Sequence, residues 1–208
     1  MTGRVRDVMI GSADPEELSR FWSSLLELPS EGRRDQAVKV ALRGDVGLLF
    51  SPTPSRKQGK NRIHVDLAST TTDHQKTIVE RALRLGAVAV DIGQGSVPWV
   101  VLADPEGNEF CVLEPRDEYS DTGPIAAVVI DSLNPPALAQ FWSRALGLPV
   151  ERERADFASL RQKPGFWVEF VRVAEINTAG SRVRLGVVQP AGGVALTDPE
   201  GNEFFVVT

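Results

Sequence analysis

The sequence predicts an α+β fold in which paired βαβββ modules form two curved mixed sheets around a cleft, with the helices outside. Two repeated segments carry this prediction. ADPEGNEFCVLEP, at 103–115, returns as TDPEGNEFFVVT at 197–208, and ADPEELSRFWSSLLELP, at 13–29, returns as LNPPALAQFWSRALGLP at 133–149. We therefore expect two copies of one structural plan.

Each copy is expected to begin with a strand, near 5–11 and 125–131, followed by an amphipathic helix. Asp14 and Asn134 are N-cap residue types, and a proline follows each of them at the first helical position. Apolar residues recur at helical spacing in the first of these helices, at Leu18, Phe21, Trp22, Leu25 and Leu26. We assign the Phe-Trp pairs at 21/22 and 141/142 to core packing.

The repeated DPEGNEF segments are expected to be the turns of two β-hairpins. Asp104 can bond to its own downstream backbone, Pro105 fixes φ for a type I turn, and Gly107 tolerates a positive φ. Apolar runs flank both segments. We interpret the carboxylates of the two turns as turn formers and solvated charges: Asp104, Glu106, Asp198 and Glu200.

The spacing of the repeats indicates that the second copy has lost a helix. The Phe-Trp pairs are 120 residues apart, and so are NRIHVDLAS at 61–69 and SRVRLGVVQ at 181–189, whereas the hairpins are 94 apart. The difference, 120 − 94, leaves 26 residues missing from the second copy. The first copy has there an amphipathic pattern that predicts a helix over 73–86, stopped by Gly86.

The remaining strands are predicted from alternating or continuous apolar runs between turn signals. In the first copy they lie near 37–43, 46–51, 62–68, 87–92, 98–103 and 109–114, and in the second near 156–161, 166–173 and 182–188, before the final hairpin. Residues 114–124, EPRDEYSDTGP, are charged and rich in turn formers, which predicts a linker. We expect a first domain at 1–115, a linker at 116–123 and a second domain at 124–208.

Composition limits the class of protein. The chain has 208 residues, 42% hydrophobic residues, one cysteine and a formal net charge of −5. These features predict a protein without a membrane span, without an internal disulfide and without a nucleic-acid partner. We expect a cytoplasmic protein, monomeric or homodimeric, whose partner is a small molecule.

The βαβββ repeats, the DPEELSRFW helix start and the PWVVLADPEGNEFCVLE ending resemble the vicinal oxygen chelate superfamily. This superfamily includes glyoxalase I, bleomycin-resistance proteins, fosfomycin-resistance enzymes and extradiol dioxygenases. More narrowly, the chain is similar to bacterial glyoxalase-like proteins with two such domains. The resemblance spans nearly the whole chain and implies the fold more specifically than the reaction, because the same cup serves several chemistries.

The resemblance also implies positions for metal ligands, on the first and last strands of successive modules. In the first copy these positions hold Asp7, Leu49 or Phe50, His64 and Cys111, and in the second Ala127, Glu169, Arg184 and Phe205. If each copy closes its own cup, Asp7, His64 and Cys111 share one cup, and Glu169 and Arg184 the other. If the copies exchange halves, one cup contains His64, Cys111 and Glu169, a feasible three-ligand zinc set.

Structural interpretations compete with these assignments. His64 in the strand RIHVDL can be a hydrogen-bonded core residue, and Cys111 can be a small buried hydrophobe. Asp66 shares a strand face with His64 and can orient it. Arg184 cannot bind a cation but suits a ligand carboxylate, phosphate or sulfate. Glu169 interrupts an apolar run, so it must face solvent, pair with a cation or serve the cleft.

Two functions from different classes remain. The preferred one is metal-free binding, as in bleomycin-resistance proteins, of an aromatic or amphiphilic small molecule. Its expected contacts are His64, Asp66, Trp99, Trp167, Phe50 and Arg184. The alternative is a lyase, isomerase or extradiol-type dioxygenase with one divalent zinc, iron or manganese ion held by His64, Cys111 and Glu169. Metal-free acid and base catalysis by Asp7, His64 or Glu169 is a third hypothesis.

Overall fold

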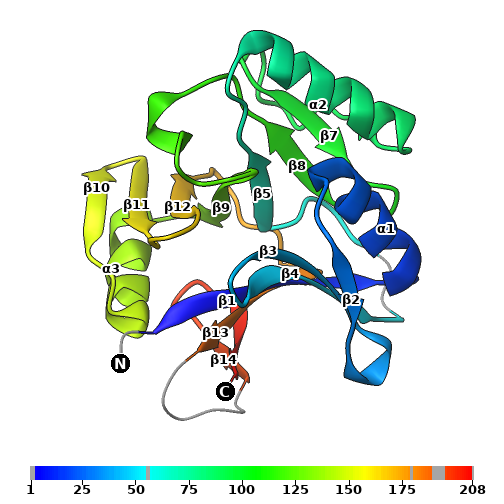
Figure 1. The fold of residues 1–208 in the computed structure, drawn as a ribbon. Helices are drawn as coiled ribbons and strands as arrows, with labels where there is room; N and C mark the ends of the chain where they lie inside the picture. Colours follow the sequence, from blue (N-terminus) through cyan, green and yellow to red (C-terminus); the bar gives the residue numbers. More distant parts are fainter. Residues whose placement is uncertain (1–2, 55–56, 179, 189–194, 208) are drawn as a thin grey trace.

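The computed structural model describes residues 3–54, 57–178, 180–188 and 195–207, whose strands form two mixed sheets (Figure 1). The seven-stranded sheet has the order β14 (Ala195–Thr197), β15 (Glu203–Val207), β13 (Val183–Val188), β1 (Arg4–Ser12), β4 (Val46–Pro52), β3 (Val38–Arg43), β2 (Ser30–Gly32). The eight-stranded sheet has the order β10 (Val150–Arg154), β11 (Phe157–Arg161), β12 (Trp167–Arg172), β9 (Ile125–Ser132), β5 (Ile63–Leu67), β8 (Glu109–Val112), β7 (Val100–Ala103), β6 (Val88–Ala89).

The two copies exchange halves. Strand β1 of the first copy pairs antiparallel with β13 of the second, and β5 of the first pairs antiparallel with β9 of the second. Each sheet therefore combines one module from each copy, which is the exchanged arrangement of the two that the sequence left open. Each sheet would lose its central pairing if either copy were removed.

The period-two alternation of the strands separates the main core from the opposite face of each sheet. In β5, Ile63, Val65 and Leu67 point into the main core, and His64 and Asp66 point to the opposite face of the sheet. The same sorting holds across the seven-stranded sheet, where Leu48 and Phe50 of β4 belong to the core. The sheets thus share one main core, and the opposite face of the eight-stranded sheet carries His64 and Asp66 beside a second hydrophobic cluster that includes Val101, Val129 and Trp167.

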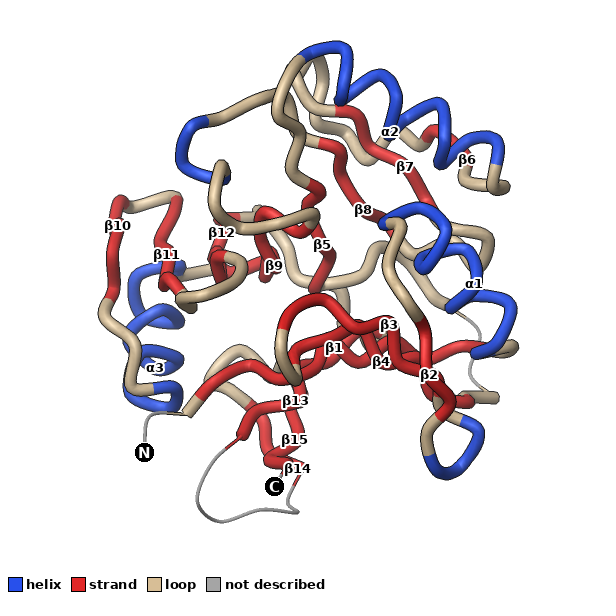
Figure 2. The backbone as a smooth tube through the Cα atoms, in the orientation of Figure 1, coloured by secondary structure: helices blue, strands red, loops and turns tan. Residues whose placement is uncertain are grey.

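Three α-helices lie in the described part of the chain, α1 (Pro15–Leu26), α2 (Thr72–Arg84) and α3 (Pro135–Leu146), close to the predicted positions, together with two short 3-10 helices, η1 (Arg34–Gln36) and η2 (Asp117–Tyr119). Asp14 caps α1 by accepting from the backbone N–H of Glu17 at 2.9 Å, and Asn134 caps α3 from Ala137 at 3.4 Å. Figure 2 shows α1 and α2 beside each other and α3 on the other side of the molecule. Residues 189–194, where the last predicted hairpin begins, lie outside the described residues.

The carboxylates of the DPEGNEF turns fasten the helices, and the two aspartates are buried turn formers rather than solvated charges, which corrects that part of the sequence interpretation. Asp104 and Asp198 are only 2% and 4% exposed. Each accepts a hydrogen bond from an indole Nε1, of Trp22 at 3.2 Å and of Trp142 at 3.1 Å respectively. The carboxylate of Glu106 accepts from Ser12 and the backbone of Ala13 and Asp14 at the start of α1. Glu200 repeats this role at α3.

Two edge strands, β2 and β10, were not predicted. Their sequences, SEG and VERER, are mostly polar and largely exposed, so they lack the alternating apolar signal of a half-buried strand. Both complete the outer ends of their sheets. Among the described residues, no helix is long and apolar enough to cross a membrane.

Candidate functional site

The outward face of the eight-stranded sheet forms a cup of about 960 Å³. Its floor comes from the central strands, where Asp66 of β5 lies opposite Cys111 of β8 on one side and Ala127 of β9 on the other. Glu169 of β12 lies opposite Val129 of β9. The volume lies within the usual range of small-molecule sites.

Three potential ligand groups meet on the floor of the cup. The donor atoms of His64, Asp66 and Cys111 all lie within 4.8 Å of one another. His64 Nε2 is 3.5 Å from Asp66 Oδ1. His64 Nδ1 and Asp66 Oδ1 are buried and have no hydrogen-bond partner among the described residues. Buried polar atoms without partners are costly, so they mark a place where a ligand atom, an ion or water is bound.

Burial controls the protonation of this cluster. Desolvation, followed by the nearby charge of Lys60, lowers the pKa of His64 to about 3, so its imidazole is neutral near pH 7. Desolvation and then the charge of Glu169 raise the pKa of Asp66 to about 7. Burial also raises the pKa of the Cys111 thiol, and the neighbouring Asp66 adds to this rise. The floor is therefore a largely neutral hydrogen-bonding surface below pH 7.

Glu169 is held by a residue from the segment predicted to be a linker. The Tyr119 hydroxyl donates to Glu169 Oε1 at 3.0 Å, and Tyr119 itself is buried in the cup wall. Desolvation raises the pKa of Glu169 to about 7, although the Tyr119 bond acts in the opposite direction. The linker therefore completes the site as well as joining the copies.

Aromatic and guanidinium groups form the walls. The Arg116 Cζ lies 5.7 Å from the centre of the Trp99 ring and 5.8 Å from that of Tyr119. On the other side, the Arg152 Cζ lies 4.5 Å from the centre of the Trp167 ring. Such planar stacks suit an aromatic or conjugated ligand.

Not every predicted site residue lies in this cup. His64, Asp66, Cys111, Glu169 and Trp99 line it, and Trp167 packs directly beneath Arg152 in its wall. The other predicted residues are on the seven-stranded sheet.

On that sheet, Asp7 forms ion pairs with Lys39 at 2.5 Å and Arg6 at 2.9 Å. Arg184 pairs with Glu203 at 2.5 Å. Phe50 is fully buried in the main core, because it shares a strand face with Leu48. The structure thus does not bring these three residues to the cup.

The donor set of the cup fits a divalent metal. Imidazole, carboxylate and thiolate are the ligand types of zinc sites, and His64 and Asp66 each have a buried polar atom without a partner among the described residues. The set differs from the predicted one, because Asp66 stands beside His64 and Cys111 where Glu169 was expected. Glu169 is instead turned to Tyr119. The sequence placed Asp66 on the correct strand face but treated it as a residue that orients His64.

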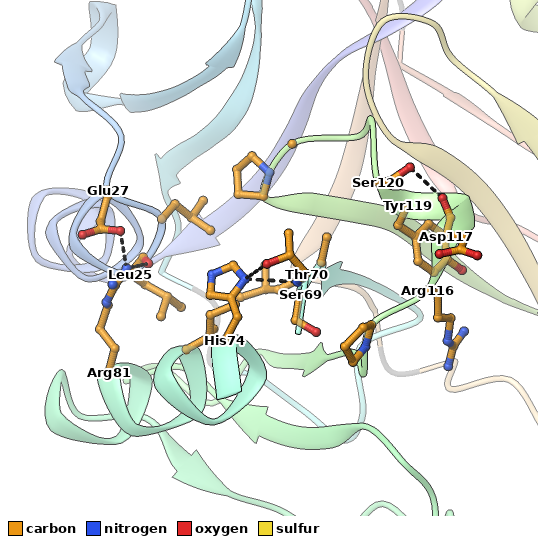
Figure 3. Close-up of a pocket in the computed structure, with 17 residues that line it drawn as sticks. Leu25, Glu27, Ser69, Thr70, His74, Arg81, Arg116, Asp117, Tyr119 and Ser120 are labelled. Carbon is orange, nitrogen blue, oxygen red and sulfur yellow. Dashed lines mark hydrogen bonds and ion pairs between the residues drawn. The ribbon is translucent and has the colours of Figure 1, made fainter. Parts of the chain in front are cut away.

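A smaller cavity of about 390 Å³ adjoins the cup (Figure 3). It lies between the end of α1, the start of α2 and the linker segment, and it shares Arg116 and Tyr119 with the cup. In Figure 3, His74 and Thr70 lie at its centre and Arg81 reaches Glu27 at one side. The linker segment is thus the wall between two cavities.

Sequence reasoning missed Arg116, Tyr119, Arg152 and Phe157. The first two lie in the charged segment assigned to a linker, where a lone tyrosine was the one sign of burial. Arg152 and Phe157 flank the hairpin between β10 and β11. Their part in the cup depends on how the two modules meet, which local patterns do not encode.

Comparisons with known proteins were made on the sequence and on the structure. The sequence matches the family described as Glyoxalase-like domain over residues 7–113 and 127–191. A search of curated protein sequences gave no match. The structure is similar to that of glyoxalase I from Zea mays, with a TM-score of 0.69 at 12% identity, covering 99% of this chain and 92% of that one.

A second similar structure is a Bacillus subtilis protein provisionally named a dioxygenase. Its TM-score is 0.59 at 14% identity, and the match covers 96% of this chain and 72% of that one. At such identities both structural matches establish a shared fold.

Proposed function

Because the chain belongs to the family of glyoxalase-like domains, within the vicinal oxygen chelate superfamily, we propose that its cup binds a small amphiphilic molecule with an aromatic portion, without a resident metal. The observation that carries this proposal is the pair of unpartnered buried atoms, His64 Nδ1 and Asp66 Oδ1, on the floor of a cavity of ligand size. A polar group of the ligand satisfies them.

The rest of the cup fits the other part of such a ligand. Trp99 and Tyr119 provide aromatic surface beside Arg116, while Leu113 and Val129 line the cavity with apolar groups. A planar ring held against this wall would place its polar substituent toward His64 and Asp66. Burial raises the pKa of the Cys111 thiol, and because a metal binds the thiolate, this raises the cost of metal binding and supports the metal-free form.

A metal-dependent lyase, isomerase or dioxygenase is the second candidate. The observation in its favour is that the donor atoms of His64, Asp66 and Cys111 lie within 4.8 Å of one another. A divalent ion held there would polarise a ligand oxygen or lower the pKa of a bound water. Glu169, hydrogen-bonded to Tyr119 and raised in pKa, would hold or release a proton beside it.

Metal analysis together with a binding probe separates the two candidates. The probe is 8-anilinonaphthalene-1-sulfonate, an amphiphilic aromatic anion whose emission rises in an apolar site. We expect less than a tenth of an equivalent of transition metal in the purified protein, and saturable probe binding that also quenches tryptophan emission. His64→Ala should weaken probe binding by about 1–2 kcal/mol, roughly 5- to 30-fold.

The matched control is Arg184→Ala, because Arg184 occupies the position of His64 in the second copy, on the other sheet. It should leave probe affinity unchanged. About one equivalent of tightly held zinc, iron or manganese, lost in both His64→Ala and Asp66→Asn, would contradict metal-free binding and support the enzyme. Equal loss of affinity in Arg184→Ala would place the probe outside the cup and contradict both.

A further inference from the structure

A third cavity, of about 230 Å³, lies where the seven-stranded sheet meets the start of β5. It shares no lining residue with the cup. Its polar lining includes Arg62, Asn177, Ser181, Arg184, Asn202 and Glu203. Arg62, Arg184 and Glu203 are its charged members, so the lining carries a net charge of +1.

The two copies differ in their hydrogen bonding at this cavity. In the first copy, Asn61 Nδ2 donates to Asn108 Oδ1 at 3.0 Å. The corresponding residues of the second copy are Ser181 and Asn202. Ser181 is shorter, and its hydroxyl donates to the Val183 carbonyl at 2.8 Å. Asn202 Oδ1 is therefore left without a partner among the described residues, in a side chain that is 3% exposed.

The orientation of the Asn202 amide is fixed. Its Nδ2 donates to Asp198 Oδ2 at 2.8 Å, and a carboxylate oxygen accepts only from the nitrogen side of the amide. The unpartnered atom of Asn202 is therefore the oxygen, an acceptor. Whatever satisfies it must donate a proton.

Arg62, in contrast, has a buried donor that needs an acceptor. Its Nη2 donates to the Glu200 carbonyl at 2.6 Å, while its Nε is buried without a partner in the described part of the chain. Its counterpart in the second copy, Arg182, also has a buried Nε without a partner among the described residues, but its guanidinium is ion-paired with the Glu106 carboxylate at 2.6 Å. Among the described residues, Arg62 thus has no ion pair, although its charge acts on the Asp131 carboxyl group, and its Nε is a donor that needs an acceptor.

We propose that this cavity binds a small oxyanion that still carries a proton, of the hydrogen phosphate class. One of its oxygens accepts from Arg62 Nε, and its hydroxyl donates to Asn202 Oδ1. The charged acceptor balances the positive charge of the Arg62 guanidinium, and the hydroxyl gives the Asn202 amide oxygen the hydrogen bond that it lacks. Sulfate has the same shape but no proton at neutral pH, so it would place an oxygen against the amide oxygen.

The experiment measures the thermal unfolding temperature of the full chain at pH 7 in sodium phosphate or sodium sulfate, at constant ionic strength, with calorimetric titration of each anion. Phosphate should raise Tm saturably, because a ligand that binds only the native state stabilises it. Sulfate should require at least ten times the concentration for the same shift. No phosphate effect, or equal effects of both anions, would overturn the proposal.

Three variants localise the effect. Ser181→Asn restores the amide of the first copy, so it should raise Tm in phosphate-free buffer and abolish the phosphate shift. Arg62→Gln should also abolish the shift, whereas the matched control Arg182→Gln should retain it even if its overall Tm is lower.

A Ser181→Asn protein that still responds to phosphate would show that the anion binds elsewhere. If phosphate has no effect on the wild-type chain and Ser181→Asn nevertheless raises its Tm, the cavity holds only water. Either result overturns the proposal. Probe binding in the cup is measured separately and does not depend on these outcomes.

Discussion

The hydroxyl of Tyr119 donates to Oε1 of Glu169 at 3.0 Å, which joins the segment between the two copies to the floor of the cup. Both side chains are buried, and the carboxyl group of Glu169 has a pKa near 7. Because Glu169 lies in the cup and titrates near pH 7, changing it tests how the stability of the protein depends on pH.

The first prediction is that Glu169→Gln stabilises the protein at alkaline pH. Burial raises the pKa of Glu169 from 4.5 to about 7, so the folded state holds its proton more tightly than the unfolded state does. Stability contributed by this group is therefore present below pH 4.5 and is lost as pH rises toward 7. We expect Glu169→Gln to be more stable than wild type at pH 8 by on the order of 1–3 kcal/mol.

Urea unfolding of both proteins between pH 4.5 and 8 checks this. The difference between them should shrink toward zero at the acidic end, because Glu169 is then protonated in both folded and unfolded chains. A difference that stays constant across this range would show that the side chain acts through packing alone.

The second prediction has the opposite sign of pH dependence and concerns Glu106. Burial opposes its ionisation, but hydrogen bonds from Ser12, Ala13 and Asp14 and from Arg182 outweigh this and lower its pKa below 4.5. Its contribution is therefore present above pH 4.5 and is lost as pH falls through the folded-state pKa. Glu106→Gln should cost about 1 kcal/mol at pH 7, as for a lost helix cap, and less at pH 3. Thermal unfolding at the two pH values measures the change.

The third prediction concerns the hydrogen bonds that the Trp22 and Trp142 indoles donate to buried carboxylates. Trp22→Phe and Trp142→Phe each remove the donor to a buried carboxylate, Asp104 or Asp198, and should each cost about 1–3 kcal/mol. Denaturant unfolding is the measurement. Replacing Trp22 together with Asp104→Leu should cost less than the sum of the two single changes, because the carboxylate is then no longer buried alone. Strict additivity would mean that the hydrogen bond contributes nothing.

The fourth prediction tests the turns. Gly107 and Gly201 have φ of +84° and +78°, which a β-branched residue adopts only with strain. A Cβ at either position meets no atom closer than 3.8 Å, so the cost is conformational rather than steric. Gly107→Val and Gly201→Val should each lower stability by about 1–3 kcal/mol without changing probe affinity. An unchanged Tm would refute the left-handed assignment.

The fifth prediction is that residues 122–208 expressed alone are unfolded or aggregated. In the full chain β9 pairs with β5, and β13 pairs with β1, so the isolated second copy would expose two long strand edges and their apolar face. Size-exclusion chromatography and circular dichroism test this. A soluble fragment with a cooperative melting transition would contradict it.

Local patterns in the sequence determined much of this protein. An α+β fold with two copies and a lost helix was predicted from three features: the repeats at offsets of 120 and 94, the helices with a proline at the first helical position, and the period-two strands. The same alternation put His64 and Asp66 on one face of a strand, because side-chain direction in a strand depends only on neighbouring backbone. These features depend on neighbouring residues, so they can be predicted from the sequence alone.

Tertiary structure alone decided which residues meet. The exchange of modules brought Glu169 into the cup with His64 and Cys111 and left Asp7 and Arg184 on the other sheet, because strand partners far apart in sequence are chosen by burial of whole faces. The same contacts buried Asp104 against Trp22 and turned Tyr119 from a linker residue into part of the site. Each of these outcomes depends on partners 50 or more residues away, and no local pattern of turns or hydrophobicity identifies such a partner.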